Sequence, residues 1–364
     1  MVGISIYANT LRVGGLERVT VNLANGLADA GNDVSLVLVS AEGDLLNEVC
    51  DDVHVVDLAA DRVLTSALPF RRHLVDAGTD VCISMGAHVN GIAGLVTRTI
   101  RNPPALICTH HSILRKMDPG LKRRVLRILV RQAYSRADGV VCVSRDVLEY
   151  VRCELGVPAD RSRVIYNPVL DKSFYDQENP APDHPWFGAD ADVPVVVSAG
   201  RHAPEKDFRT LVDAFASLRE KREARLVLIG DGPEHEALVE YADSMDVAED
   251  IDLPGFVNNV YPYMSNANVF ALSSKTEVFG MVIVEAMGCG CPVVSTDCTG
   301  PTEILADGEY GPLSPVGDVE RMADALERTL NDPLDVETLR SRAREFSTER
   351  SVERYEALIE SVIG

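Results

Sequence analysis

Short runs rich in Val, Ile and Leu alternate with amphipathic segments along most of this 364-residue chain. Two such runs, residues 3–8 and 33–40, flank a segment with helical periodicity that ends at Gly31. This order is typical of a β-α-β unit. Strands that are apolar along their whole length and separated by helices indicate parallel sheets covered on both faces. The alternation therefore predicts an α/β fold with doubly wound parallel sheets.

The alternation occurs twice, and the chain is longer than one hydrophobic core normally organises. The first series continues with strand candidates at residues 80–84, 105–109, 139–144 and 163–167. The second series has strand candidates at residues 193–200, 225–232, 251–255, 268–274 and 291–297. Its helix candidates are residues 208–223, 234–245 and 281–288. Two tandem domains are therefore expected.

A segment rich in Pro, Asp and Asn, residues 170–194, separates the two series and contains the only Trp. Such a composition is typical of a linker. The predicted parts are a Rossmann-like domain at 1–170, a linker at 171–192, a second Rossmann-like domain at 193–345 and a final helix at 346–364. Ser347 or Thr348 is expected to cap that helix. In such folds the ligand lies outside the carboxyl ends of the strands, so functional residues are sought there.

The charge of the chain limits the partners to consider. Its formal net charge of −21 argues against nucleic acid, because binding phosphates requires a basic surface. Six lysines stand against 29 arginines and 56 acidic residues. This composition fits a high-salt cytosol, where salt screens the repulsion between charges, and it equally fits an acidic surface encoded by a GC-rich genome.

The termini and the cysteines suggest a cytosolic protein without metal or disulfides. No run of eighteen uncharged apolar residues occurs, and the N-terminus lacks the basic region and cleavage site of a secretory signal. The eight cysteines show no C-x-x-C pair and lie mostly in apolar runs. We expect them to be small buried hydrophobic residues, with no metal site.

Two carboxylates stand out in the second half. Glu285 lies in the apolar segment 281–288, which predicts a helix buried all round. An ionised carboxylate there requires compensation, either from a distant arginine or from a ligand with two adjacent hydroxyls, such as a ribose. Glu277 follows a strand, and the turn at Phe279 and Gly280 can present backbone amides at a helix N-terminus. Such a turn suits phosphate or sugar oxygens.

Other strand ends of the second half carry candidate ligand groups. Arg201 and Lys206 lie on a loop that opens a helix, where two cations suit a diphosphate. Gly230 belongs to a tight turn after the next strand, which by itself is most often only a loop. Phe256 and Val257 follow a third strand, either as core residues or as an edge against which a base can lie.

The first half offers a glycine loop and two histidines. Gly14 and Gly15 join the first strand to its helix and allow a ligand to approach the backbone. This loop is not G-x-G-x-x-G, so a dinucleotide site is disfavoured. His110 and His111 end a strand, where a ligand contact and a structural role are both reasonable.

Residues 113–136 reverse the charge of the chain, with eight basic residues and one Asp. Arg123, Arg127 and Arg131 repeat at i, i+4 and i+8. The opposite stripe is apolar and comprises Leu121, Val125, Ile128, Leu129 and Ala133. A basic amphipathic helix of this kind can bind an anionic membrane surface. The alternative is a solvated helix packed on its own domain.

Several short motifs together resemble the retaining glycosyltransferases of family four, of the GT-B type. They are "GR" at 200–201, "EK" at 205–206, "GDGP" at 230–233, the E-x7-E pair Glu277 and Glu285 around "FG", and "STDCTGPTEIL" with "YGPLSPVGD". The resemblance implies two Rossmann-like domains with a cleft between them. It places a nucleotide sugar mainly on the second domain and the acceptor on the first, requires no metal or cofactor, and has the final helix cross back to the first domain.

The resemblance also implies roles for residues of the second domain. Arg201 and Lys206 match the pair that binds the diphosphate. Glu285 matches the carboxylate on the ribose hydroxyls, and Gly230 lies in a donor-binding loop. Glu277 matches the cradle for the donor sugar and phosphate, together with the backbone amides of Phe279, Gly280 and Met281.

In the first domain, Gly15 matches the glycine-rich loop near the phosphate, and His111 matches a histidine near the transferred sugar, with His110 as the alternative. Asn167 matches the motif before the linker. Charge that develops on the leaving phosphate must be stabilised, and Arg201 and Lys206 would do this. No carboxylate is placed as a nucleophile, so attack from the same face, with retention of configuration, is expected.

The closing motifs are similar to enzymes that extend lipid-linked glycans. The expected donor is a UDP-activated hexose or N-acetylhexosamine, and the expected acceptor is a polyprenyl- or dolichyl-linked glycan at the inner face of the membrane. Alternatives are a transferase with a soluble acceptor, a UDP-sugar 2-epimerase on the same scaffold, and an inactive sugar-nucleotide-binding module. The Asp-Ala-Asp at 190–192 is interpreted as surface rather than as a metal site.

Overall fold

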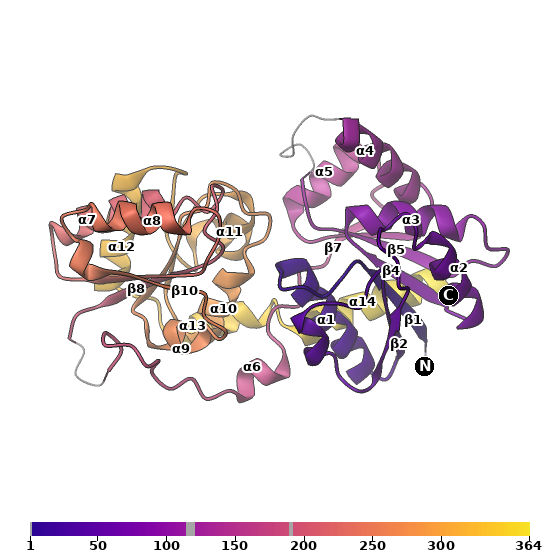
Figure 1. Cartoon of the computed structure of the whole chain (residues 1–364), viewed down its shortest axis with the longest axis horizontal. Coiled ribbons are helices and arrows are strands. Elements are labelled where there is room, and N and C mark those ends of the chain that lie inside the picture. Colours follow the sequence, from indigo (N-terminus) through magenta and orange to yellow (C-terminus); the bar gives the residue numbers. More distant parts are fainter. Residues whose placement is uncertain (1, 114–120, 189–191) are drawn as a thin grey trace. The chain divides into compact units, whose positions relative to one another are not determined.

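The computed structural model describes residues 2–113, 121–188 and 192–364, with the backbone alone over 121–125. Figure 1 shows the whole chain. The chain divides into two compact units. The first contains Met1–Asp171 and Phe346–Gly364, and the second contains Lys172–Glu345.

The first unit is built on a seven-stranded sheet with the order β3-β2-β1-β4-β5-β6-β7, in which every pair of neighbours is parallel. Its strands are β1 (Gly3–Ala8), β2 (Asp33–Leu38), β3 (Val53–Asp57), β4 (Val81–Met85), β5 (Ala105–His110), β6 (Gly139–Cys142) and β7 (Ser162–Val164). Strand order reverses between β1 and β4, so this is the topological switch point of the sheet. The predicted α/β fold with parallel sheets is confirmed.

The helices of the first unit are α1 (Gly15–Asp29), η1 (Asp44–Glu48), α2 (Ala67–Asp76), α3 (Ala87–Thr97), α4 (Leu121–Tyr134), α5 (Arg145–Leu155) and α14 (Thr348–Ile363). The crossovers from β1 to β2 and from β4 to β5 run in opposite directions. Because such crossovers are right-handed, α1 and α3 cover opposite faces of the sheet. Figure 1 shows α14 beside α1.

The C-terminal helix α14 is an integral part of the first unit. The Ser347 side chain accepts a hydrogen bond from the Arg350 amide and caps the helix, as expected. Its apolar side is buried, with Tyr355, Leu358 and Ile359 each at most 3% exposed. A Cβ at Gly26 of α1 would lie only 2.6 Å from the Thr348 methyl group. The two helices therefore pack at close range because α1 has a glycine there.

The second unit contains a six-stranded parallel sheet with the order β10-β9-β8-β11-β12-β13. Its strands are β8 (Val195–Ala199), β9 (Arg225–Ile229), β10 (Ile251–Gly255), β11 (Val269–Leu272), β12 (Val293–Thr296) and β13 (Leu313–Ser314). The switch point lies between β8 and β11. Residues that follow these two strands therefore meet at the carboxyl edge of the sheet.

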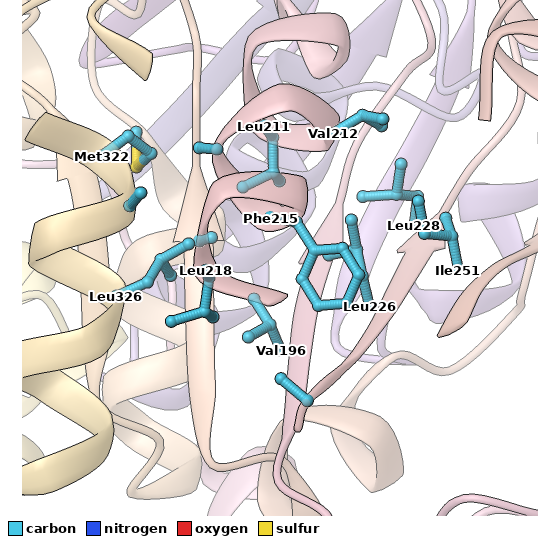
Figure 2. Packing of buried hydrophobic residues seen from close by; sticks show 14 of the residues in the cluster. Val196, Leu211, Val212, Phe215, Leu218, Leu226, Leu228, Ile251, Met322 and Leu326 are labelled. Atoms are coloured by element: carbon cyan, nitrogen blue, oxygen red, sulfur yellow. The ribbon is translucent and has the colours of Figure 1, made fainter. Parts of the chain in front are cut away.

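The helices of the second unit are α6 (Lys172–Asp176), α7 (Phe208–Arg219), α8 (His235–Asp243), η3 (Ala248–Asp250), α9 (Tyr261–Asn266), α10 (Met281–Cys289), α11 (Thr299–Ile304), η4 (Ala306–Gly308), α12 (Val319–Asn331) and α13 (Val336–Arg344). One face of the sheet is covered by α7, α8 and α12. Figure 2 shows Phe215 and Leu218 of α7 packed between the strands and Leu326 of α12, and all three side chains are fully buried. This core fixes the sheet whose edge carries the site.

The segment that we expected to be a linker is largely packed on the second unit. The Phe174 ring contacts the Tyr261 ring edge-on with centroids 4.9 Å apart, and His184 Nε2 lies 3.1 Å from Asp252 Oδ2. The Arg225 guanidinium lies over the Trp186 ring at 4.9 Å. The aromatic residues of the segment, rather than its Pro and Asp content, decide where it packs.

One strand and two cysteines differ from what the sequence predicted. Strand β3 was not predicted, because it lies at the sheet edge with only Val53 fully buried, so its sequence lacks a continuous apolar run. Of the eight cysteines, all free, six are buried, but Cys50 is half-buried and Cys153 is exposed on α5. The expectation of buried cysteines therefore fails at these two positions.

Candidate functional site

Lys206 and Glu277 meet at the switch point of the second sheet. They lie on the loops after β8 and β11, and Lys206 Nζ donates to Glu277 Oε2 at 2.5 Å. Both side chains are about one-fifth exposed, at 20% and 19%. The loops are also joined by the Ser273 hydroxyl, which donates to the Lys206 carbonyl at 2.9 Å. Two residues singled out separately in the sequence thus form one ion pair.

The turn before α10 leaves a helix N-terminus open beside this pair. Gly280 has φ of 96°, a conformation that disfavours a side chain, and no described side chain caps the helix. The Glu277 carbonyl accepts from the Gly300 amide at 3.1 Å and from the Thr299 hydroxyl at 3.0 Å, which fixes the turn. Phe279 is buried and Met281 begins the helix. The first-turn amides and the helix dipole together favour an anionic oxygen.

Glu285 lies on the more exposed side of α10. The prediction of burial all round is wrong: Met281, Val282 and Glu285 are half-buried, whereas the rest of the helix is buried. These three positions share one side because they are spaced i, i+1 and i+4. Glu285 therefore lies one turn beyond the open N-terminus, on one side of the helix with Met281. Its charge is less costly than that of a fully buried carboxylate, since the residue is half-buried.

Arg201 is exposed on the loop after β8, next to a fully buried histidine that the sequence analysis did not single out. The His202 amide donates to the Asp231 carbonyl at 2.9 Å, and His202 Nδ1 lies 2.9 Å from His235 Nδ1. Burial, with the charge of His235, lowers the pKa of His202 to about 4, so its ring is neutral at pH 7. His202 ties the loop of Arg201 to the loop after β9. The position of His202 between the "GR" and "EK" motifs is the sequence feature that could have identified it.

Gly230 allows this close approach of the two loops. Its φ is 140°, and a Cβ there would lie 1.9 Å from the Gly200 carbonyl oxygen. Phe256, after β10, is 64% exposed, and Val257 is half-buried. Phe256 is therefore a surface ring at a strand's carboxyl end and not a core residue.

In the first unit, the loops after β1 and β4 meet at the switch point. Helix α1 begins at Gly15, and no described side chain caps it at Gly14. Gly86 follows β4 with φ of 95°, and a Cβ there would lie 3.0 Å from Leu16 Cδ2 of α1. Gly15 thus lies at the carboxyl edge of this sheet, as predicted.

The two histidines after β5 have different environments. His111 is half-buried, its Nε2 lies 2.8 Å from the Thr109 hydroxyl, and burial, with the charge of His110, lowers its pKa to about 3. His110 is fully buried, and its Nδ1 lies 2.6 Å from the Tyr134 hydroxyl. Burial lowers the pKa of His110 to about 4, although the Ser112 backbone opposes this shift. His111 is therefore the one with access to a ligand, and His110 is a core residue.

The basic helix α4 packs on its own unit. Its buried residues include Val130, Ala133 and Tyr134, and a Cβ at Gly94 of α3 would lie 2.6 Å from Ala133 Cα. The predicted apolar stripe is wrong at Ile128, which is 56% exposed. Ala133 is buried against Gly94 of α3, as the stripe predicted, whereas Val130 is buried where Ile128 was expected.

The three arginines of this helix differ in what they can offer. Arg127 pairs with Glu154 of α5 at 3.1 Å, whereas Arg131 is exposed. The side chain of Arg123 lies outside the described residues. Among the described helices, none combines the length and apolar character needed to cross a bilayer.

Asp192 is exposed, and Asp190 lies outside the described residues. Over 2–113, 121–188 and 192–364, no three His, Cys, Asp or Glu side chains are grouped to hold a metal ion.

Comparison with known proteins assigns both halves of the chain. Residues 13–171 match the model described as Glycosyltransferase Family 4, and residues 183–348 match Glycosyl transferases group 1. The solved structure of HepE from Anabaena in complex with UDP superposes with a TM-score of 0.81, at 20% identity, covering 99% of this chain and 100% of that one. This structural likeness concerns the fold.

Similar sequences are glycosyltransferases and related synthases. The lipopolysaccharide core biosynthesis glycosyltransferase LpsE of Rhizobium meliloti is 29% identical over 94% of this chain and 92% of its own. The N-acetyl-alpha-D-glucosaminyl L-malate synthase of Bacillus anthracis is 27% identical over 68% of this chain and 64% of its own. An N-acetylgalactosaminyltransferase of Campylobacter jejuni, named for a diphospho-undecaprenol acceptor, is 28% identical over 73% of this chain and 71% of its own. With both of its halves matched, the chain belongs to the family-four glycosyltransferases.

Proposed function

We propose that this protein transfers a hexose or N-acetylhexosamine from a nucleoside-diphosphate sugar, with UDP favoured, to a polyprenyl- or dolichyl-linked glycan. The transfer retains the configuration of the sugar and needs no metal or other cofactor. The observation that carries this proposal is the Lys206–Glu277 pair at the switch point, beside the open N-terminus of α10. This arrangement places a cation, a carboxylate and backbone amides together at the carboxyl edge of the second sheet.

The diphosphate is bound by cations and amides of the second unit. Lys206 Nζ has three N–H donors, so it can keep its bond to Glu277 and still donate to a phosphate oxygen. Arg201 is exposed on the same loop, and a guanidinium binds phosphate in a bidentate manner. The amides of Gly280 and Met281 supply further donors. These groups stabilise the charge that develops on the leaving phosphate.

Retention follows from how Glu277 is used. Its Oε2 is engaged by Lys206, which makes the carboxylate a weak nucleophile and a good acceptor for sugar hydroxyls. The acceptor hydroxyl then attacks from the face of the leaving diphosphate, through an oxocarbenium-like state, and the departing phosphate oxygen takes its proton. The configuration at the anomeric carbon is kept.

The nucleoside is held at the same edge. Glu285 accepts the two ribose hydroxyls, and Phe256 offers an exposed ring against which the base stacks, with Val257 beside it. Gly230 lets the loop after β9 lie close to the loop after β8. UDP is the favoured nucleotide because HepE, which shares the fold, was solved with it.

The first unit takes the acceptor, with Gly15 and His111 at its strand edge. A lipid-linked acceptor is supported by the undecaprenol-linked substrate named for the Campylobacter jejuni relative. Exposed Arg131 and Ile128 on α4 would touch an anionic membrane surface, with Arg123 adding charge. Arg127 contributes less, since Glu154 neutralises it. We place the protein in the cytoplasm, peripherally bound to the inner face of the membrane.

A donor screen tests the proposal. Purified protein is incubated with UDP- and GDP-sugars, with lipid-linked or soluble glycans and with a chelator, and release of nucleoside diphosphate is measured. We expect UDP release only when a lipid-linked acceptor is present. An epimerase would invert one carbon of the sugar without releasing UDP. Equal activity on soluble glycans would contradict the lipid-linked acceptor. In an Arg131→Glu and Ile128→Glu double variant, activity on vesicle-borne acceptor should fall while activity on detergent-dissolved acceptor is kept.

A further inference from the structure

Thr109, at the end of β5, lies at the centre of a buried hydrogen-bond cluster next to His111. Its hydroxyl oxygen lies 3.1 Å from the Ser84 carbonyl oxygen, accepts from the Gly86 amide at 3.2 Å and lies 2.8 Å from His111 Nε2. The Thr109 side chain is fully buried. The carboxyl ends of β4 and β5 therefore meet on one hydroxyl.

The protons in this cluster can be assigned by counting. A hydroxyl has one proton to donate and two lone pairs to accept with. The Ser84 carbonyl can only accept, so it takes the Thr109 proton, and the Gly86 amide fills one lone pair. The remaining lone pair faces His111 Nε2, which must then carry a proton.

The opposite assignment is disfavoured. If Thr109 donated to His111 Nε2, its oxygen and the Ser84 carbonyl oxygen would face each other at 3.1 Å without a proton between them. In that arrangement the hydrogen bond to His111 would form only at the expense of the bond from Thr109 to Ser84. The neutral ring is thus protonated on Nε2 and has its lone pair on Nδ1.

His111 Nδ1 is the atom left for a ligand. The side chain is half-buried, and Nδ1 has no hydrogen-bond partner within the described part of the chain. Burial lowers the pKa of His111 to about 3, so the ring stays neutral and keeps that lone pair near pH 7. A neutral acceptor at a strand's carboxyl end suits a hydroxyl group.

A second shared network holds the cluster in place. The Asn90 amide donates to the Thr109 carbonyl at 2.7 Å and to the Tyr134 hydroxyl at 3.0 Å, and its oxygen accepts from Ser84. The Tyr134 hydroxyl in turn lies 2.6 Å from His110 Nδ1. Asn90 is fully buried with its oxygen and its NH2 group both bonded, and a buried amide satisfied in this way holds one geometry.

We propose that Thr109 is a positioning residue that fixes His111 as the Nε2-protonated tautomer, so that Nδ1 accepts a hydrogen bond from a hydroxyl group of the substrate at the carboxyl edge of the first sheet. This inference rests on the proposed transferase function for its ligand. The tautomer itself does not depend on that function.

The test combines nitrogen NMR of the histidine rings with kinetics of two Thr109 variants. In the free wild-type protein, the His111 signals, assigned by their loss in His111→Ala, should show protonated Nε2 and bare Nδ1 at pH 7. Thr109→Ser retains the hydroxyl and should retain tautomer and activity. Thr109→Val removes it, so the tautomers should mix and kcat/KM should fall roughly tenfold, the equivalent of one hydrogen bond. Thr97→Val is the matched control, since Thr97 is a buried threonine of α3 whose hydroxyl bonds only backbone carbonyls.

The outcomes separate the two claims. If Nδ1 of His111 carries the proton in the wild type, the inference is overturned whatever the activity. It is also overturned if Thr109→Val keeps both the wild-type tautomer of His111 and the wild-type kcat/KM. If Thr109→Val does not fold, the wild-type spectrum and the kinetics of Thr109→Ser still decide. A protein with the expected tautomer that releases no nucleoside diphosphate from any sugar nucleotide refutes the proposed function, and with it the substrate hydroxyl as ligand.

Discussion

Lys206 is held in place before any ligand binds, because Glu277 neutralises it at 2.5 Å in a setting where both side chains are largely covered. An ammonium without this partner would be free to adopt many rotamers, and its immobilisation on binding would be costly. The carboxylate thus gives the lysine a fixed position from which it can contact a phosphate oxygen. The pair is best understood as one functional group.

Lys206→Ala should chiefly slow the sugar-transfer step, since it removes a cation from the leaving phosphate. A loss of about 100- to 1000-fold in the single-turnover rate is expected for one such donor. Lys275→Ala is the matched control, because this neighbouring lysine is half-exposed and pairs with Asp207 at 2.8 Å instead. An unchanged single-turnover rate in Lys206→Ala would refute the role of the leaving-group cation.

At this scale, sequence patterns located the residues but not their surroundings. Lys206 and Glu277 could be chosen because each follows a strand, yet their pairing depends on β8 and β11 being neighbours. The burial of Glu285 was overestimated, because an apolar sequence does not reveal which side of a helix is uncovered. His202 was missed because its role depends on contacts with the loop after β9.

At the scale of elements, most strands and helices could be predicted because parallel strands are apolar throughout. Helix α10, expected at 281–288, spans Met281–Cys289, and β1 and β10 coincide with their predicted ranges. Edge strand β3 could not be found this way, since it lacks a continuous apolar run. In α4 the predicted apolar stripe holds at Ala133 and fails at Ile128, because burial is decided by what α3 presents and not by the sequence of α4.

Gly280→Ala tests the turn that opens α10. With φ of 96°, Gly280 is in a conformation that costs an L-residue about 1–2 kcal/mol, so the free energy of unfolding of the variant should fall by that amount. Chemical denaturation measures this change. Gly188→Ala is the control, because Gly188 lies outside the positive-φ range and no atom of the described residues is within 4 Å of an added Cβ. Equal stability of the two variants would show that the turn carries no such strain.

For the molecule as a whole, the acidic composition predicts dependence on salt. A net charge of −21 produces self-repulsion that opposes compaction, and salt reduces its range from about 10 Å at 0.1 M to about 3 Å at 1 M. The midpoint of thermal unfolding should therefore rise with NaCl over this range. Sucrose, which does not screen charge, is the control.

The size of this rise separates the two explanations for the composition. A protein adapted to a high-salt cytosol should be unfolded or marginal below 0.1 M salt, whereas an acidic surface from a GC-rich genome predicts a rise of only a few degrees. A midpoint that is constant or falls in NaCl would contradict the repulsion argument itself.

We propose above all that the carboxyl edge of the second sheet binds a nucleoside diphosphate, with Glu285 on the ribose. Calorimetric titration of UDP into the wild type, into Glu285→Ala and into the surface control Glu320→Ala tests it most directly. We expect binding by the wild type and the control, and affinity reduced by roughly ten- to 100-fold in Glu285→Ala, as for the loss of hydrogen bonds to a charged group. Wild-type affinity in Glu285→Ala, or no binding of UDP or GDP by the wild type, would contradict it.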